Sequence, residues 1–149
     1  MLIYLDNCCY NRPYDDKSLL SINLESQAKL YIQLKIKDGV YELVTSYMLY
    51  YEVFQTPDIV RRQAILQFIE EQSSLYVGDE WKKTVEENAQ DIMARGVKFK
   101  DACHLASAIL AHCVYLITTD KRLQKYHSDR ITVINPVDFV MRMEANYEQ

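Results

Sequence analysis

Two carboxylates directly follow short apolar stretches of this sequence. Asp6 comes after the β-prone run Leu2–Leu5, and Asp120 comes after Val114–Thr118 with only Thr119 between them. Runs of this kind predict buried strands, on which an aspartate is uncommon. If the two strands are neighbours in a parallel sheet, both side chains lie in the crevice at its carboxyl edge, where ligands bind. The sequence therefore predicts a functional site at that edge.

Two further carboxylates stand in apolar surroundings. Glu52 lies within SYMLYYEVFQ, and Asp101 lies near the start of KFKDACHLASAILAHC, a predicted helix that is apolar almost all round. Asp101 falls in the first turn of this helix, where the helix dipole favours an anion. Each residue also has an ordinary explanation, because Asp101 could be only a helix-start residue and Glu52 an exposed position. The four acids together favour a common site.

Such a group of carboxylates is chemically specific. Several acids in one crevice repel one another unless a cation neutralises them. Hard oxygen ligands select Mg²⁺ or Mn²⁺, and these ions can activate water and stabilise an in-line displacement at a phosphodiester. The residues therefore predict metal-dependent phosphoryl chemistry. Four residues are both metal ligands and catalytic residues in this prediction: Asp6, Glu52, Asp101 and Asp120.

The elements that must position these residues alternate along the chain. Strands are predicted over Leu2–Leu5, Tyr41–Thr45, Leu75–Val77, Val114–Thr118 and Ile131–Ile134. Helices are predicted over Ser18–Lys37, Ser46–Gln55, Pro57–Glu71, Asp79–Gly96 and Lys98–Cys113, and from Pro136 onward. This alternation predicts an α/β fold, a three-layer α/β/α sandwich around a central parallel sheet of about five strands.

The helical spacing also predicts which side chains share a face. In the first helix the apolar residues at helical spacing are Leu20, Leu24, Ala28, Tyr31 and Leu34. Thr56 and Pro57 read as the cap and first position of the third helix. Asp79 reads as the cap of the fourth, which carries one apolar stripe: Trp81, Val85, Ala89 and Ile92.

Length and charge narrow the function classes. The chain has 149 residues, enough for one domain over residues 1–149. A net charge of −4 argues against a broad basic groove for duplex nucleic acid. No apolar run approaches the roughly 20 residues of a membrane span, and no signal peptide is visible, so we expect a cytoplasmic protein. The four cysteines lack metal-binding spacing and are expected to be free thiols: Cys8, Cys9, Cys103 and Cys113.

Several basic and polar residues lie near the predicted site. Arg12 and Lys121 are candidates for contact with a substrate phosphate, although both could be ordinary surface residues. His104 follows Asp101 by one helical turn, and we interpret it as a core or supporting residue because oxygen ligands are already sufficient.

The chain resembles PIN domains, compact metal-dependent nucleases found in many prokaryotic toxin–antitoxin systems. The resemblance rests on IYLDNCC, the glutamate of SYMLYYEV, KFKDACHLASA and LITTDKRL, in the order of the family. It implies an α/β/α sandwich, Mg²⁺ or Mn²⁺ as cofactor and cleavage of single-stranded RNA. The four acids match the family's acidic residues, with Thr118 and Asn7 in its supporting polar positions. The resemblance also implies an antitoxin partner and a homodimer, for which the Ser18–Lys37 and Pro57–Glu71 helices are candidate surfaces.

Other classes fit less well. A DxD-type phosphatase needs an aspartate where Cys8 stands, and the glycines are too far apart for a P-loop or a dinucleotide fingerprint. A receiver domain needs a phosphoacceptor ending its third strand, and Gly78-Asp79 is a poor match. The serious alternative is a non-catalytic PIN-like module that binds RNA or protein, against which the four intact acids argue.

Overall fold

A five-stranded parallel sheet forms the centre of the computed structural model, which describes residues 1–148. Its strand order is β3-β2-β1-β4-β5. The strands are β1 (Leu2–Leu5), β2 (Glu42–Ser46), β3 (Ser73–Val77), β4 (Tyr115–Ile117) and β5 (Thr132–Ile134). The predicted α/β class and parallel sheet are confirmed.

The order of the strands places a crevice beside β1. The chain runs outward from β1 through β2 to β3, and then returns to the other side of β1 to form β4 and β5. In the register of β1 and β4, Leu5 lies opposite Ile117. The winding therefore reverses between these two strands, and the residues that follow them emerge side by side at the carboxyl edge of the sheet.

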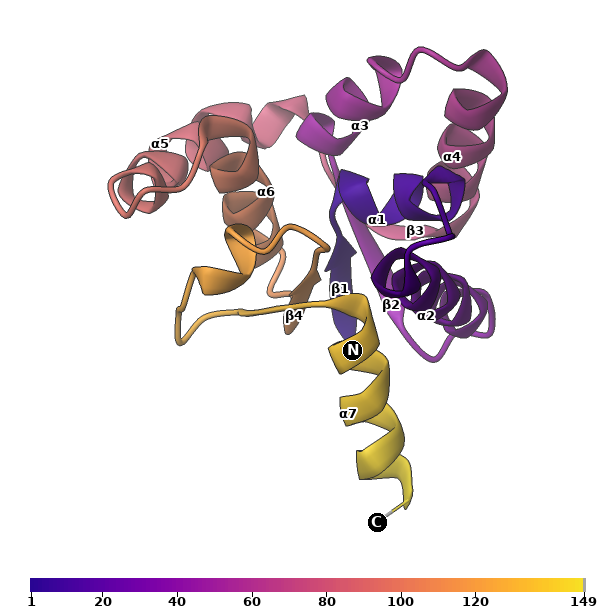
Figure 1. The fold of residues 1–149 in the computed structure, drawn as a ribbon. Helices are drawn as coiled ribbons and strands as arrows, with labels where there is room; N and C mark the ends of the chain where they lie inside the picture. The colour runs from indigo at the N-terminus through magenta and orange to yellow at the C-terminus, as the bar shows by residue number, and fades with distance from the viewer. Residues whose placement is uncertain (149) are drawn as a thin grey trace.

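Helices cover both faces of the sheet (Figure 1). They are α1 (Asn7–Asn11), α2 (Leu20–Lys37), α3 (Tyr47–Phe54), α4 (Ile59–Gln72), α5 (Lys82–Met93), α6 (Phe99–Leu110) and α7 (Pro136–Glu148). Short 3₁₀ turns lie at Arg12–Tyr14, Asp79–Trp81 and Leu123–Lys125. Helices α5 and α6 lie on one side of β1, and α1, α2 and α4 lie on the other, as Figure 1 shows. Among the residues described, no helix is both long and apolar enough to cross a membrane.

Two hydrophobic cores fill the spaces between the layers. Tyr4 belongs to the core under α5 and α6, whereas Ile3 and Leu5 belong to the core under α2 and α4. This division follows from the alternation of side chains along a strand. Helix α6 buries Ala102–Ala108 completely or nearly so, which confirms the prediction that this helix is sandwiched in the core.

Helix α2 does not bury the residues that share its apolar spacing. Leu20 is 73% exposed and Leu34 is 59% exposed, whereas Glu25 and Lys29 are buried together with Ile32. The helix packs against the Arg12–Tyr14 turn and α7, and these neighbours decide which side is covered. Apolar residues occur on more than one side of α2, so periodicity alone does not identify the buried face.

Two predicted helix starts are wrong. The N-cap of α4 is Asp58, whose Oδ1 accepts a hydrogen bond from Arg61 N at 3.0 Å, and not Thr56. Asp79 opens a 3₁₀ turn that precedes α5, and this turn leaves Trp81 46% exposed instead of in the core. The remaining stripe of α5 is buried as predicted: Val85, Ala89 and Ile92. All four cysteines are free thiols, as predicted.

Candidate active site

Asp6 is held firmly at the end of β1. Its Oδ1 accepts a hydrogen bond from Asn7 N at 2.8 Å, which caps the short helix α1. Its Oδ2 accepts from Thr118 Oγ1 at 2.9 Å and from Cys8 Sγ at 3.3 Å. Helix α1 was not predicted, and it explains why polar residues follow the strand directly. The buried carboxylate of Asp6 is therefore fixed in both position and orientation.

Thr118 links the two strand-end aspartates. Its hydroxyl donates to Asp6 and accepts a hydrogen bond from Asp120 N at 3.1 Å. Asp120 Oδ1 in turn accepts from Arg122 N at 2.8 Å, which closes the turn after β4. A single buried hydroxyl therefore joins the ends of β1 and β4.

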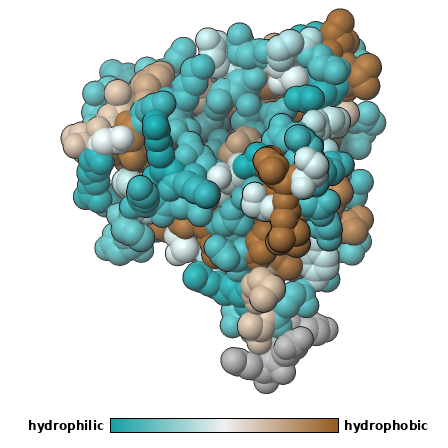
Figure 2. Space-filling view, viewed as in Figure 1, coloured by the Kyte–Doolittle hydropathy of each residue, from teal (hydrophilic) through white to brown (hydrophobic). Residues whose placement is uncertain are grey.

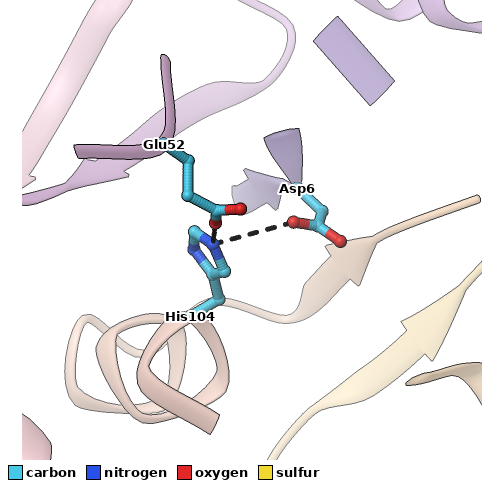
Figure 3. A group of neighbouring side chains, drawn as sticks. All are labelled: Asp6, Glu52 and His104. Carbon is cyan, nitrogen blue, oxygen red and sulfur yellow. Dashed lines mark hydrogen bonds and ion pairs between the residues drawn. The ribbon is translucent and has the colours of Figure 1, made fainter. Parts of the chain in front are cut away.

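Glu52 and His104 meet beside Asp6. Helix α3 brings in Glu52, helix α6 brings in His104, and the imidazole Nε2 contacts Glu52 Oε1 directly (Figure 3). The same Nε2 lies 3.8 Å from Asp6 Oδ1. One donor atom from each of Asp6, Glu52 and His104 lies within 4.8 Å of the other two. We call these three residues the inner cluster.

The other side of the His104 ring is also held by hydrogen bonds. Its Nδ1 lies 2.5 Å from the Tyr4 hydroxyl, which lies 2.7 Å from Ser46 Oγ. Ser46 Oγ also accepts from Leu49 N, and so caps the helix that carries Glu52. Burial lowers the pKa of His104. The hydrogen bond to Glu52 and the charges of Asp6, Glu52 and Asp101 raise this pKa by more than burial lowers it, so it lies above its usual value.

Asp101 and Asp120 lie next to the inner cluster and line one hollow with Lys98 and Arg122. We call Asp101 and Asp120 the outer pair. Burial, together with the negative charges of Asp6, Asp120 and Glu52, raises the pKa of Asp101 to about 6, although His104 acts in the opposite direction. The four predicted acids are therefore close enough to affect one another's charge.

The donor set fits a divalent cation. Carboxylate oxygens and an imidazole nitrogen are common ligands of such ions, and the excess of negative charge around Asp101 calls for a positive one. His104, interpreted from the sequence as a core or supporting residue, is fully buried and contacts Glu52. It stands three residues after Asp101 on α6, and such positions share one side of a helix.

The supporting residues have different surroundings. Asn7 gives its backbone N–H to Asp6, and its own Oδ1 accepts from Asn11 Nδ2 at 3.1 Å. Arg12 pairs with Asp15 at 3.1 Å and with Glu25 at 3.0 Å, so its guanidinium already has two carboxylate partners. Lys121 is exposed. Contact of Arg12 or Lys121 with a substrate stays a prediction.

Paired aromatic and basic side chains border the site. Lys100 Nζ lies 5.4 Å from the centre of the Tyr51 ring, and the Arg61 guanidinium carbon lies 4.8 Å from the centre of the Tyr14 ring. Lys100, Arg61 and Glu52 line the same hollow. Both tyrosines are substantially exposed, so flat apolar surface and positive charge lie together beside the carboxylates.

Comparison with known proteins agrees with this architecture. The family model described as PIN domain matches residues 16–128, a range that contains Glu52, Asp101 and Asp120 and begins after Asp6. No curated protein sequence matches the chain.

Two solved structures share the fold. One is the structure of VapBC2 from Rickettsia felis bound to a DNA fragment from its promoter, which is 14% identical in sequence and has a TM-score of 0.56. The match covers 91% of this chain and 98% of that chain. The other is FitAcB from Neisseria gonorrhoeae, with 13% identity, 90% and 97% covered, and a TM-score of 0.54.

Proposed function

Because the chain belongs to the PIN domain family, whose members are generally nucleases, we propose that it is a Mg²⁺- or Mn²⁺-dependent endoribonuclease that cleaves single-stranded RNA. The observation that carries the proposal is the meeting of Asp6, Glu52, Asp101 and Asp120 at the carboxyl edge of the sheet, beside the reversal of the winding. These four residues are the proposed metal ligands and catalytic residues.

The site residues would have different roles in the proposed reaction. When bound, the cation would act as a Lewis acid that activates water and neutralises charge at the phosphodiester. Asp6 would be a rigid ligand because Asn7 and Thr118 fix both of its oxygens. The Glu52 side chain is partly exposed in the hollow beside the site, so it can move more freely than Asp6 when substrate binds. The pKa of Asp101 is raised first by burial and then by the negative charges around it, and a divalent ion would balance those charges, which supports a cation site.

The border of the site supports a single-stranded substrate. Tyr51 and Tyr14 present exposed rings on which unpaired bases can stack, and Lys100 and Arg61 beside them can contact phosphates. A duplex would need a broad positive surface, which a net charge of −4 disfavours. Both features support a single-stranded nucleic acid, and we propose that it is RNA.

We also propose that the chain is the toxin of a toxin–antitoxin pair and forms a homodimer. Apolar side chains gather on the surface over the start of α2 and the adjoining part of α7, and again near the start of α4 (Figure 2). Large apolar side chains are exposed at six positions on α2 and α4: Leu20, Leu24, Leu30, Leu34, Ile59 and Val60. Patches of this kind favour contact with another protein surface.

Cleavage of a labelled single-stranded RNA tests the proposed activity. We expect cleavage with Mg²⁺ or Mn²⁺, none in excess EDTA, and none by Glu52→Gln, while duplex DNA stays largely intact. The matched control is Glu42→Gln, which changes an exposed glutamate at the opposite edge of the sheet. Undiminished cleavage in EDTA contradicts the proposal. Metal-independent RNA binding without cleavage supports the non-catalytic alternative.

Steady-state kinetics test the substrate class. Tyr51→Ala removes a proposed stacking surface worth roughly 1–3 kcal/mol per base, so KM for single-stranded RNA should rise about tenfold while kcat changes little. Tyr76→Ala is the control, because Tyr76 is a comparably exposed tyrosine on β3 that packs on Tyr50 outside this hollow. Equal effects of the two substitutions on KM contradict a specific role for Tyr51.

A further inference from the structure

His104 has no assigned part in the proposed reaction, although it lies at the centre of the site. The side chain is fully buried, and its Nε2 faces Glu52 Oε1 and Asp6 Oδ1 (Figure 3). A buried histidine needs hydrogen-bond partners for its ring nitrogens. Here Nε2 contacts Glu52 and also faces Asp6, two carboxylates that we propose as metal ligands.

The far side of the ring has the arrangement expected of a metal-binding histidine. A ligating imidazole normally has its second nitrogen fixed by a hydrogen bond, which sets the tautomer and the ring orientation. In His104 this is Nδ1, held by the Tyr4 hydroxyl, which is itself held by Ser46 Oγ. All three side chains are fully buried. The ring therefore cannot turn away from the inner cluster without breaking two buried hydrogen bonds.

The spacing of His104 Nε2 and Asp6 Oδ1 fits one shared ion. Two ligands that are each roughly 2.1 Å from an ion lie about 3 to 4 Å apart. The 3.8 Å between His104 Nε2 and Asp6 Oδ1 falls in this range. Glu52 Oε1 is closer to Nε2 than two ligands of one ion would be, and it would have to withdraw. Its side chain is 22% exposed and lies on the open side of the cluster, so it has room to do so.

We propose that His104 Nε2 is a direct ligand of the divalent cation, together with Asp6 and Glu52, and that this nitrogen makes the site prefer Mn²⁺ to Mg²⁺. Mg²⁺ takes oxygen ligands and water, whereas first-row transition ions accept imidazole readily. The inference rests on the metal dependence of the proposed function, and it adds a nitrogen ligand to a site otherwise built from oxygen.

Pulsed electron paramagnetic resonance of Mn²⁺ bound to the unaltered chain tests the ligand directly. We expect a hyperfine coupling from a nitrogen bonded to the ion, which changes in the characteristic way when the histidines carry ¹⁵N. Because His112 and His127 are exposed, the variants His112→Asn and His127→Asn should keep the coupling. Bound Mn²⁺ without any nitrogen coupling overturns the inference and leaves the proposed metal dependence intact. Failure of Mn²⁺ and Mg²⁺ to bind at all overturns both.

Affinity measurements on His104→Gln test the selectivity. Mn²⁺ affinity should fall at least about tenfold, while Mg²⁺ affinity should change much less. Tyr4→Phe, which removes only the hydroxyl that orients the ring, should weaken Mn²⁺ binding in the same direction by a smaller factor. If His104→Gln loses Mn²⁺ affinity and Mg²⁺ affinity by the same factor, His104 only positions Glu52. This result overturns the proposed preference for Mn²⁺. If His104→Gln does not fold by circular dichroism, the isotope experiment on the unaltered chain decides.

Discussion

Two side chains that can carry a positive charge are buried on opposite sides of the sheet, His104 on α6 and Lys29 on α2. His104 faces two carboxylates, and its pKa is raised in spite of burial. Lys29 Nζ donates to Gln33 Oε1 at 2.6 Å and lies 5.6 Å from the centres of the Tyr10 and Phe68 rings.

The difference lies in the partners and not in the depth of burial. Lys29 forms no ion pair within the described part of the chain, and burial lowers its pKa to about 8. An amide oxygen and two aromatic rings therefore do not compensate for lost hydration, whereas carboxylates do. Negative charge is concentrated at the carboxyl edge of the sheet, and this property supports our proposal of a cation site there.

The largest expected effect comes from removing one carboxylate that faces His104. Asp6→Asn keeps the oxygen that accepts from Asn7 N and removes the charge. Cleavage of single-stranded RNA should fall roughly 10²–10³-fold, comparable to the loss of a key electrostatic group in other enzymes. The ratio kcat/KM with Mn²⁺ is the measurement, and circular dichroism verifies the fold. A variant with more than a tenth of the original activity contradicts the assignment of Asp6.

A substitution at Lys29 sharpens the other half of the comparison. Lys29→Met keeps the apolar stem and removes a buried charge, so it should stabilise the protein at pH 7 by about 2 kcal/mol. Folding depresses the pKa of Lys29 from 10.5 to about 8. Between these values the unfolded chain binds more protons, so this group makes the free energy of unfolding rise with pH. That rise should vanish in Lys29→Met.

Chemical denaturation at pH 7 and at pH 8 to 10 measures this effect. Lys83→Met is the control, because Lys83 is an exposed lysine on α5 that does not contribute to the pKa shift of Lys29, so its loss should leave the pH dependence unchanged. A destabilised Lys29→Met protein at pH 7 would show that the aromatic rings do compensate the charge.

A smaller change in stability is expected in the outer pair. The metal-free protein should gain roughly 1 kcal/mol from Asp101→Asn, a value reduced for partial exposure, because Asp101 has a pKa of about 6 when folded and 3.8 in its reference state. Between these values the folded protein binds more protons, so the free energy of unfolding falls as pH rises. The substitution should remove this fall.

Thermal unfolding of both proteins, in EDTA and in millimolar Mn²⁺, gives the test. The ion should raise the melting temperature of the parent more than that of Asp101→Asn, because binding to the folded state stabilises it. If the variant melts at a lower temperature than the parent in EDTA and Mn²⁺ shifts both equally, Asp101 is a helix-start residue only.

The smallest effect belongs to an exposed histidine. His112 has a φ of 61°, in the left-handed region that asparagine tolerates better than most residues. His112→Asn should raise the melting temperature by about 1 °C and leave cleavage unchanged. Altered cleavage in this variant would show that His104 is not the only histidine that affects the site.

The sequence predicted the sheet well because its strands are short apolar runs with clear ends. Strand β1 was predicted to the residue, and the condition that it neighbours the strand before Asp120 is met by the pairing of β1 with β4. The prediction was weaker for α2, where apolar residues on several sides compete and long-range packing covers Lys29 instead of Leu20.

The candidate site shows the same limit. Aspartates at strand ends can be recognised in a sequence. The contact of His104 with Glu52 cannot, because Glu52 lies on another helix, 52 positions away in the sequence. A buried histidine within an apolar helix gives no sign of such a partner. Tyr4 is equally hidden, since its hydroxyl meets His104 across 100 positions of sequence.

The central position of β1 also has a consequence for protein synthesis. Asp6 leaves the ribosome well before Thr118, which holds its carboxylate and is made 112 residues later. At about 5 to 20 residues per second, translation needs roughly 5 to 20 seconds to supply that partner. Until then β1 lacks β4, and the acids at the carboxyl edge have no common surface. A nascent chain that has not yet exposed β4 can therefore have no complete site, so the nuclease that we propose would be inactive while it is being made.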